Sequence, residues 1–95
     1  MPINAQEALR SGLVSRVVPE AELEDETRRT IDAILGKSKP VIALGKRFMY
    51  EQMGMGLQEA YGKGACVMVD NINMADGQEG IDSFIAKRKP IWADE

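Results

Sequence analysis

The chain has 95 residues, of which 44% are hydrophobic and 28% charged, a composition and size typical of one small globular domain. It has no histidine and a single cysteine, Cys66, which excludes an internal disulfide, Ser-His and Cys-His nucleophile pairs and the usual zinc sites. The net charge of -3 disfavours general attraction to nucleic acid, and no apolar run approaches the ~18 residues of a membrane span. We therefore expect neither a nucleic-acid nor a membrane partner.

The first twenty residues predict one short helix and one short strand. Asn4 and Glu7 have the spacing of a capping box, and Gly12 suits the left-handed residue that ends many helices. Residues 13–18 are rich in β-branched side chains and stop at Pro19, which predicts a strand. No later segment has a comparable β pattern. We expect this orphan strand either to lie extended on the helices or to pair with a sheet outside these residues.

Four further helices are predicted after Pro19. Apolar residues at three- and four-residue intervals indicate a helix that Gly36 ends, and Pro40 suits the first turn of the next helix. A third helix is predicted from Leu57 to Ile72. The last is predicted from Asp76, which with Glu79 repeats the capping-box spacing, and ends at a basic run before a proline. The expected fold is therefore mainly α: five helices and one short orphan strand.

Two groups of acidic residues could offer carboxylates to a metal ion or act as a general base. Residues 20–26 carry five acids at the start of a predicted helix, where the helix dipole alone favours them, so a solvated face is the preferred interpretation. Asp70, Asp76 and Glu79 form a more compact set, but the last two are already assigned as caps. We predict no catalytic residue and no metal ligand in this chain.

Sulfur-containing side chains are also given structural roles. Cys66 lies in a predicted helix without a histidine to lower its pKa, and we predict that it packs in the core. Methionines at helical spacing could form a malleable binding groove, but filling of the core is the preferred interpretation. These methionines are Met49, Met53, Met55, Met68 and Met74.

Phe84, Lys87 and Arg88 form the candidate binding site. A helix places them along nearly one face, and an aromatic ring with two cations suits an aromatic base and its phosphate, through stacking and charge-assisted hydrogen bonds. The alternative is that the cations only complement the negative end of the helix dipole. From periodicity alone the helix-dipole interpretation is preferred, and neither interpretation provides a nucleophile or a base.

The order and spacing of several short motifs resemble the C-terminal part of the crotonases, the enoyl-CoA hydratase/isomerase superfamily. The resemblance covers essentially the whole chain, and its most specific piece runs from Glu79 to Pro90. Two further motifs, residues 68–71 and 90–92, are most similar to the enoyl-CoA hydratase domain-containing proteins within that superfamily. The motifs are Asn4-Ala5-Gln6-Glu7-Ala8, Gly12-Leu13-Val14, Val17-Val18-Pro19, Lys39-Pro40 with Lys46, Asp76-Gly77-Gln78-Glu79-Gly80, and Phe84 with Lys87-Arg88 and Pro90.

The resemblance implies that residues 1–95 are the C-terminal helical region, through which subunits assemble into trimers or hexamers. It further implies that the N-terminal spiral of ββα repeats, with the oxyanion hole and the acid/base carboxylates, precedes this region and is absent from it. Phe84 and Lys87 match residues near the adenine and 3′-phosphate of coenzyme A, and Arg88 also matches the pattern. The implied substrate of the parent protein is an acyl-CoA thioester, with no covalent cofactor.

Two functional hypotheses follow. In the first, the chain is a helical module that serves subunit assembly and forms part of a CoA-binding wall, while the parent hydrates or isomerises enoyl-CoA thioesters; this module alone is not catalytic. In the second, it is a free-standing protein-interaction module without CoA binding, which contacts its partner through Phe48, Met49 and Met53. The first implies a cytoplasmic location in bacteria and the mitochondrial matrix in eukaryotes.

Overall fold

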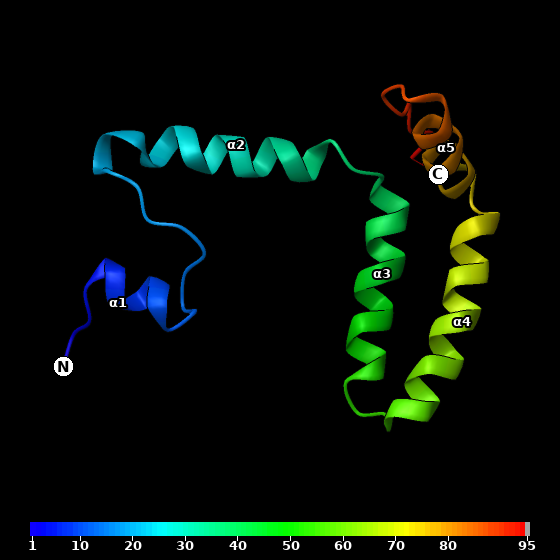
Figure 1. The fold of residues 1–95 in the computed structure, drawn as a ribbon, viewed down its shortest axis with the longest axis horizontal. Coiled ribbons are helices and arrows are strands. Elements are labelled where there is room, and N and C mark those ends of the chain that lie inside the picture. Colours follow the sequence, from blue (N-terminus) through cyan, green and yellow to red (C-terminus); the bar gives the residue numbers. More distant parts are fainter. Residues whose placement is uncertain (95) are drawn as a thin grey trace. The chain divides into compact units, whose positions relative to one another are not determined.

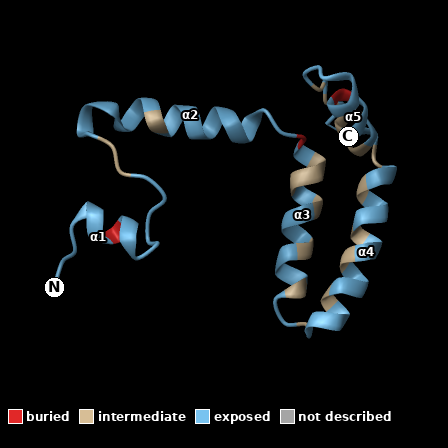
Figure 2. Ribbon diagram, viewed as in Figure 1, coloured by how far each residue is buried: buried red, intermediate tan, exposed pale blue. Residues whose placement is uncertain are grey.

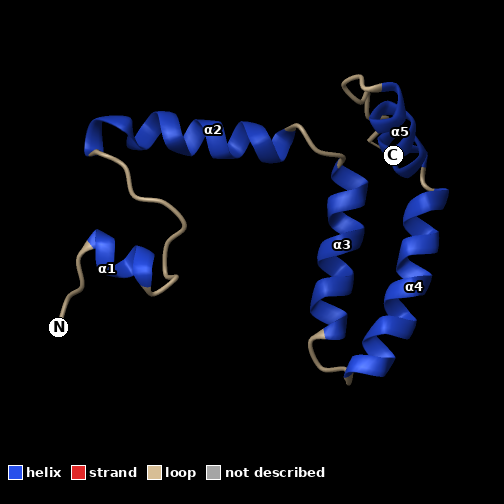
Figure 3. Cartoon of the chain, in the orientation of Figure 1, coloured by secondary structure: helices blue, strands red, loops and turns tan. Residues whose placement is uncertain are grey.

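The structure is a computed structural model and describes residues 1–94. It contains five α-helices and one 3-10 helix in this range (Figure 1; Figure 3). The mainly α fold predicted from the sequence is therefore confirmed. The elements are α1 (Ala5–Arg10), η1 (Glu20–Glu22), α2 (Leu23–Leu35), α3 (Lys39–Gln52), α4 (Leu57–Asn73) and α5 (Ala75–Ala86).

The predicted strand over residues 13–18 does not form. This segment has no strand in the structure, and among residues 1–94 no other strand lies beside it (Figure 3). Two backbone bonds tie its start to α1: the N–H groups of Leu13 and Val14 donate to the carbonyl of Ala8. β-branched residues favour an extended chain, but a strand also needs a neighbour to pair with its backbone, so the segment remains an extended loop.

The chain divides into two compact units, residues 1–34 and 35–95. In the first unit α1 begins with the predicted capping box: Asn4 Oδ1 accepts from the Glu7 N–H at 2.9 Å and Glu7 Oε2 accepts from the Asn4 N–H at 3.1 Å. Gly12 takes the predicted left-handed conformation, with φ of 79°. At the start of α2, Glu26 pairs with both Arg16 and Arg29. These contacts hold the extended segment against α2.

In the second unit α3 and α4 are joined by a short turn and run side by side, and α5 contacts both (Figure 1). α4 packs closely against α3 at Gly64, where a Cβ atom would lie 3.3 Å from the Phe48 ring. A larger residue at Gly64 would therefore require the Phe48 ring to shift slightly. Around Gly62, in contrast, the space is open.

A buried carboxylate joins the three parts of the second unit. Asp76, in the first turn of α5, is 1% exposed, and its Oδ2 accepts from the Ser38 hydroxyl at 2.5 Å. Its Oδ1 accepts from the Ala93 N–H at 2.7 Å, and Oδ2 also accepts from the Asp94 N–H at 3.1 Å. Ser38 is the N-cap of α3. One side chain therefore connects the start of α3, the start of α5 and the C-terminal segment.

The capping box predicted for the last helix is wrong. The N-cap of α5 is Met74, which provides no side-chain cap, so Asp76 lies inside the first turn. Its carboxylate is used by the three distant partners above, and Glu79 pairs elsewhere. Spacing in the sequence could not distinguish a cap from a tertiary contact, because both use a carboxylate near a helix N-terminus.

Apolar side chains are mostly exposed in this chain. Within residues 1–94 the one buried hydrophobic residue is Ala8, and nearly the whole ribbon is classed as exposed or intermediate (Figure 2). The methionines predicted to fill a core do not: Met53 is 71% exposed and Met68 57%. The predicted core role of Cys66 is also wrong, since its side chain is exposed. These side chains lack a covering layer in this chain.

The junction between α4 and α5 requires a glycine. A Cβ atom on Gly77 would lie 1.9 Å from the backbone oxygen of Asn71, so we expect Gly77→Ala to displace α5 and to destabilise the fold by about 1–3 kcal/mol or more. Gly80→Ala is the matched control, because a Cβ there would lie 3.7 Å from the Trp92 ring, an ordinary contact. It should be neutral or stabilising by up to about 1 kcal/mol. Urea unfolding of both variants measures the difference, and equal stabilities would contradict this packing.

Candidate functional site

The candidate site lies where α5 ends and the chain reverses direction. The Lys87 N–H donates to the Phe84 carbonyl at 3.2 Å and the Arg88 N–H to the Ser83 carbonyl at 3.0 Å, the two bonds of a Schellman motif. Lys87 occupies its left-handed position, with φ of 55° and ψ of 42°. Ser83 is buried and its hydroxyl donates to the Gly80 carbonyl at 3.1 Å. These backbone bonds to the last turn of α5 define the course of the reversal.

A bidentate ion pair supports the reversal from outside. Arg88 Nη1 and Nη2 donate to the two carboxylate oxygens of Glu79, at 2.7 and 2.9 Å. The Ile91 N–H donates to the same carboxylate at 2.7 Å. Glu79 therefore holds the residues that follow Lys87 against α5, two turns from the end of the helix.

Hydrogen bonds favour the ionised form of two of the carboxylates on α5, Asp76 and Glu79. The hydrogen bond from Arg88, followed by that from the Ile91 N–H, lowers the pKa of Glu79 to about 2. Hydrogen bonding from Ser38 lowers the pKa of Asp76, against the opposing effect of burial. Arg88 in turn has a raised pKa, chiefly because of its hydrogen bonds to Glu79. Both carboxylates are consequently fixed negative charges and not proton donors near neutral pH.

A groove of about 570 Å³ lies beside this reversal, between the first turns of α3 and one face of α5. Phe84 lines it from α5, although 84% of the side chain is exposed. Lys37 lines it from the loop before α3, and Trp92 from the C-terminal segment. The Trp92 indole N–H donates to the Gly36 carbonyl at 2.8 Å, which fixes this ring. The groove thus combines two aromatic rings with a cation.

The structure brings the three predicted site residues to one end of α5, but the prediction that one helix face carries them is wrong, because α5 ends at Ala86 and only Phe84 lies on it. Their environments also differ. Phe84 and Lys87 are exposed, whereas the terminal nitrogens of Arg88 are bonded to Glu79. Sequence reasoning missed Lys37, which lies 47 positions before Phe84, because only the fold brings the two segments to one groove. The sequence pattern assigns Glu79 as a helix cap, whereas in the structure it is the partner of Arg88.

The acidic candidates do not form a metal site. Within residues 1–94 no group of three or more potential ligands from histidine, cysteine, aspartate and glutamate is close enough to hold an ion. The acidic residues around the start of α2 are exposed, except Glu26, whose carboxylate forms ion pairs with Arg16 and Arg29. None of the helices over this range combines the length and apolar character that a membrane crossing requires.

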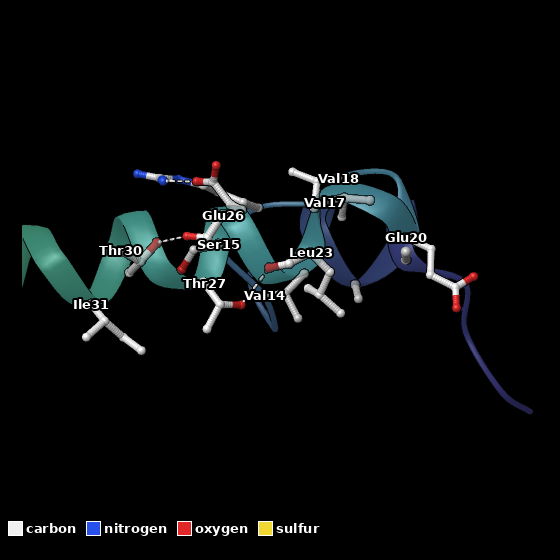
Figure 4. Close-up of a pocket in the computed structure, with 13 residues that line it drawn as sticks. Val14, Ser15, Val17, Val18, Glu20, Leu23, Glu26, Thr27, Thr30 and Ile31 are labelled. Atoms are coloured by element: carbon white, nitrogen blue, oxygen red, sulfur yellow. Dashed lines mark hydrogen bonds and ion pairs between the residues drawn. The ribbon is translucent and has the colours of Figure 1, made fainter.

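Two larger grooves are mainly apolar. One of about 650 Å³ lies between α3 and α4, with Phe48 and Leu44 on one side and Tyr61 and Met68 on the other. The other, of about 760 Å³, lies within the first unit, where Val14, Leu23 and Ile31 face it (Figure 4). The groove of the first unit also contains the carboxylates of Glu20 and Glu26, but Glu26 is paired with two arginines.

Comparison with known proteins gives the class to which this fold and sequence belong. Residues 1–95 match the family described as enoyl-CoA hydratase/isomerase. The chain is 54% identical over 92 residues to mouse "Enoyl-CoA hydratase domain-containing protein 3, mitochondrial", covering 97% of this chain and 31% of that protein.

Solved structures agree in fold. The crystal structure of human enoyl coenzyme A hydratase domain-containing protein 3 is 52% identical and superposes with a TM-score of 0.90, covering 97% of this chain and 36% of that one. An enoyl-CoA hydratase of Mycobacterium smegmatis is 32% identical with a TM-score of 0.86, covering 95% of this chain and 35% of that one.

The chain therefore belongs to the enoyl-CoA hydratase/isomerase family, and the resemblance read from the sequence motifs is confirmed. It spans about a third of the length of the relatives that it matches. Among these relatives are mitochondrial proteins of animals and bacterial proteins.

The Glu79–Arg88 pair predicts an acid-dependent loss of stability. Because folding lowers the pKa of Glu79 from 4.5 to about 2, its contribution is complete above about pH 4.5 and is lost as the pH falls towards 2. Glu79→Gln should lower the melting temperature at pH 7 by several degrees, and its difference from the parent chain should shrink over this pH window. Thermal unfolding followed by circular dichroism measures both.

Asp82→Asn is the control, since it removes a carboxylate from the same helix that makes no hydrogen bond within residues 1–94. A Glu79→Gln difference that stays constant from pH 7 to 2 would show that the carboxylate is not held in its ionised form by the fold.

Proposed function

We propose that this chain is the C-terminal helical module of an enoyl-CoA hydratase/isomerase family protein, and that it serves subunit assembly and forms part of the wall of a CoA site. Family membership supports the general assignment, and the chain's coverage of about a third of its relatives supports the interpretation as one part of a larger protein. The observation that carries the binding role is the exposed Phe84 ring beside the Lys87 reversal.

In this proposal the ligand is the adenine and 3′-phosphate end of coenzyme A. Phe84 offers an exposed aromatic face for stacking, and the Lys87 ammonium offers charge-assisted hydrogen bonds to a phosphate. Arg88 belongs to the same cluster, although its terminal nitrogens are bonded to Glu79. An acyl-CoA thioester is then the substrate, and no covalent cofactor is required.

The chemistry of the parent protein would take place outside these residues. Hydration or isomerisation of an enoyl-CoA requires donors that stabilise the thioester oxyanion and a group that moves a proton. Within residues 1–94 the two carboxylates with a lowered pKa are committed to structural bonds. This module therefore positions the ligand and does not itself perform the reaction.

Assembly is supported by the exposed apolar surface. Leu57 and Tyr61 on α4 are 76% and 74% exposed, and Ile85 on α5 is 73% exposed. Apolar faces of this extent are usually covered in a soluble protein, either by further chain or by another subunit. A trimeric or hexameric parent, in the cytoplasm of a bacterium or the mitochondrial matrix of a eukaryote, is the proposed setting.

One observation favours the alternative, a protein-interaction module without CoA binding. Met49 on α3 is 48% exposed and Met53, which caps the end of that helix, is 71% exposed. Phe48 lines the apolar groove between α3 and α4. Replacing Met53 by Asp should then abolish binding of a defined protein partner. In the preferred proposal it leaves CoA binding unchanged, because Met53 lies at the opposite end of α3 from the Lys37 groove.

CoA binding can be tested by titrating the isotopically labelled chain and following backbone amide signals. We expect changes of chemical shift confined to residues 84–89. Lys87→Glu should weaken CoA binding by about 1–3 kcal/mol, because it replaces the ammonium group that contacts the phosphate with a negative charge that repels it. Lys89→Glu is the control, with the same charge change two residues away. Equal losses of CoA affinity in the two variants would show that only the overall charge of this region matters and that Lys87 makes no specific contact. The absence of any change in the amide signals would contradict CoA binding by this module.

Self-association of the isolated chain follows from its uncovered apolar faces. We expect sedimentation velocity to show oligomers whose proportion rises with protein concentration, and unfolding with a low melting temperature. Tyr61→Glu, at a highly exposed position on α4, should shift the population towards monomer. A strictly monomeric chain with a sharp unfolding transition would contradict the assembly role.

A further inference from the structure

We propose that Glu79 and Arg88 are positioning residues: they hold the chain after α5 so that Lys87 stays in its left-handed conformation and directs its ammonium group to the phosphate. This inference rests on the CoA site proposed above. It assigns the second cation of the predicted cluster, Arg88, to support of the site and leaves Lys87 as the cation that meets the ligand.

The first observation is the residue type at the left-handed position of the Schellman motif. Glycine is the residue that favours this position, because a Cβ atom is disfavoured at positive φ. Here the position is taken by Lys87, at φ of 55°. A side chain kept at a strained position where glycine fits better indicates that the side chain itself is used.

The second observation is the set of bonds that imposes this conformation. The Glu79 carboxylate accepts three hydrogen bonds, two from Arg88 and one from the Ile91 N–H, all between 2.7 and 2.9 Å. The partners lie one and four residues after Lys87. Together with the two backbone bonds of the Schellman motif, they hold the chain on both sides of Lys87 and leave it little choice of φ.

The third observation is the contrast between the two cations. Both terminal nitrogens of Arg88 donate to one carboxylate, whose charge neutralises the guanidinium. Among residues 1–94 no acidic side chain forms an ion pair with Lys87. An incoming phosphate would therefore compete with Glu79 for Arg88 but meet an unpaired ammonium at Lys87.

The experiment compares Glu79→Gln, Lys87→Ala and the double variant, with two measurements on each folded chain. The first is the backbone φ of Lys87, from the ³J(HN–Hα) coupling and Cα chemical shift. The second is CoA affinity from amide titration. Asp82→Asn is the control, because it removes the same charge from α5 without removing a bond to Arg88. If Glu79→Gln does not fold, Arg88→Lys, which keeps the charge but loses the bidentate geometry, replaces it.

We expect Glu79→Gln to move Lys87 out of the left-handed region and to lower CoA affinity about three- to tenfold. In the Lys87→Ala background the same change should have no further effect on affinity, because Glu79 acts through Lys87. Asp82→Asn should leave the φ of Lys87 unchanged, and its effect on CoA affinity should not depend on whether Lys87 is present.

Two results would overturn the inference. Retention of the left-handed φ in Glu79→Gln would show that the carboxylate does not impose the conformation, and an additive loss in the double variant would show that it acts on the ligand independently of Lys87. Failure of the parent chain to bind CoA would refute the proposed function, and the φ measurement would still decide whether Glu79 holds Lys87.

Discussion

The second unit depends on the buried carboxylate of Asp76. Its partners come from three separate segments: the Ser38 hydroxyl that caps α3, and the N–H groups of Ala93 and Asp94 in the C-terminal segment. A carboxylate so nearly enclosed is tolerated because hydrogen-bond donors surround its charge. Since little apolar surface is buried in this chain, these directional bonds determine where α5 and the C-terminal segment lie relative to the start of α3.

The exposed apolar faces are the second constraint. The helices form locally, with caps and turns that need no distant contact, as the capping box of α1 and the serine cap of α3 show. What such helices lack is a layer to cover their apolar sides. Membership of the enoyl-CoA hydratase/isomerase family and the limited coverage of longer relatives support the proposal that further chain or other subunits cover these faces.

The end of α5 joins these structural elements to the proposed binding role. Glu79 lies one turn after Asp76, and its carboxylate holds the chain that follows α5. Phe84 and Lys87 lie exposed at the reversal where α5 ends. The two acids thus have related roles, since each holds a different part of the C-terminal segment against α5. An exposed aromatic ring and a cation then lie on a rigid frame, which is what recognition of a base and its phosphate requires.

The sequence determined the order of the helices, most of their ends and the family, but neither the cap of α5 nor its end at Ala86. Periodicity and local signals such as Asn4–Glu7, Gly36 and Pro40 were sufficient because they act within one turn of the chain. It also identified Phe84, Lys87 and Arg88 as a cluster. Only the tertiary structure decided what depends on distant partners: that residues 13–18 form no strand, that Asp76 and Glu79 are not caps, that Cys66 is exposed, and that Lys37 shares a groove with Phe84. The physical reason is that the same side chain can satisfy a nearby or a remote donor, and the spacing of residues along the chain does not show which donor lies within reach.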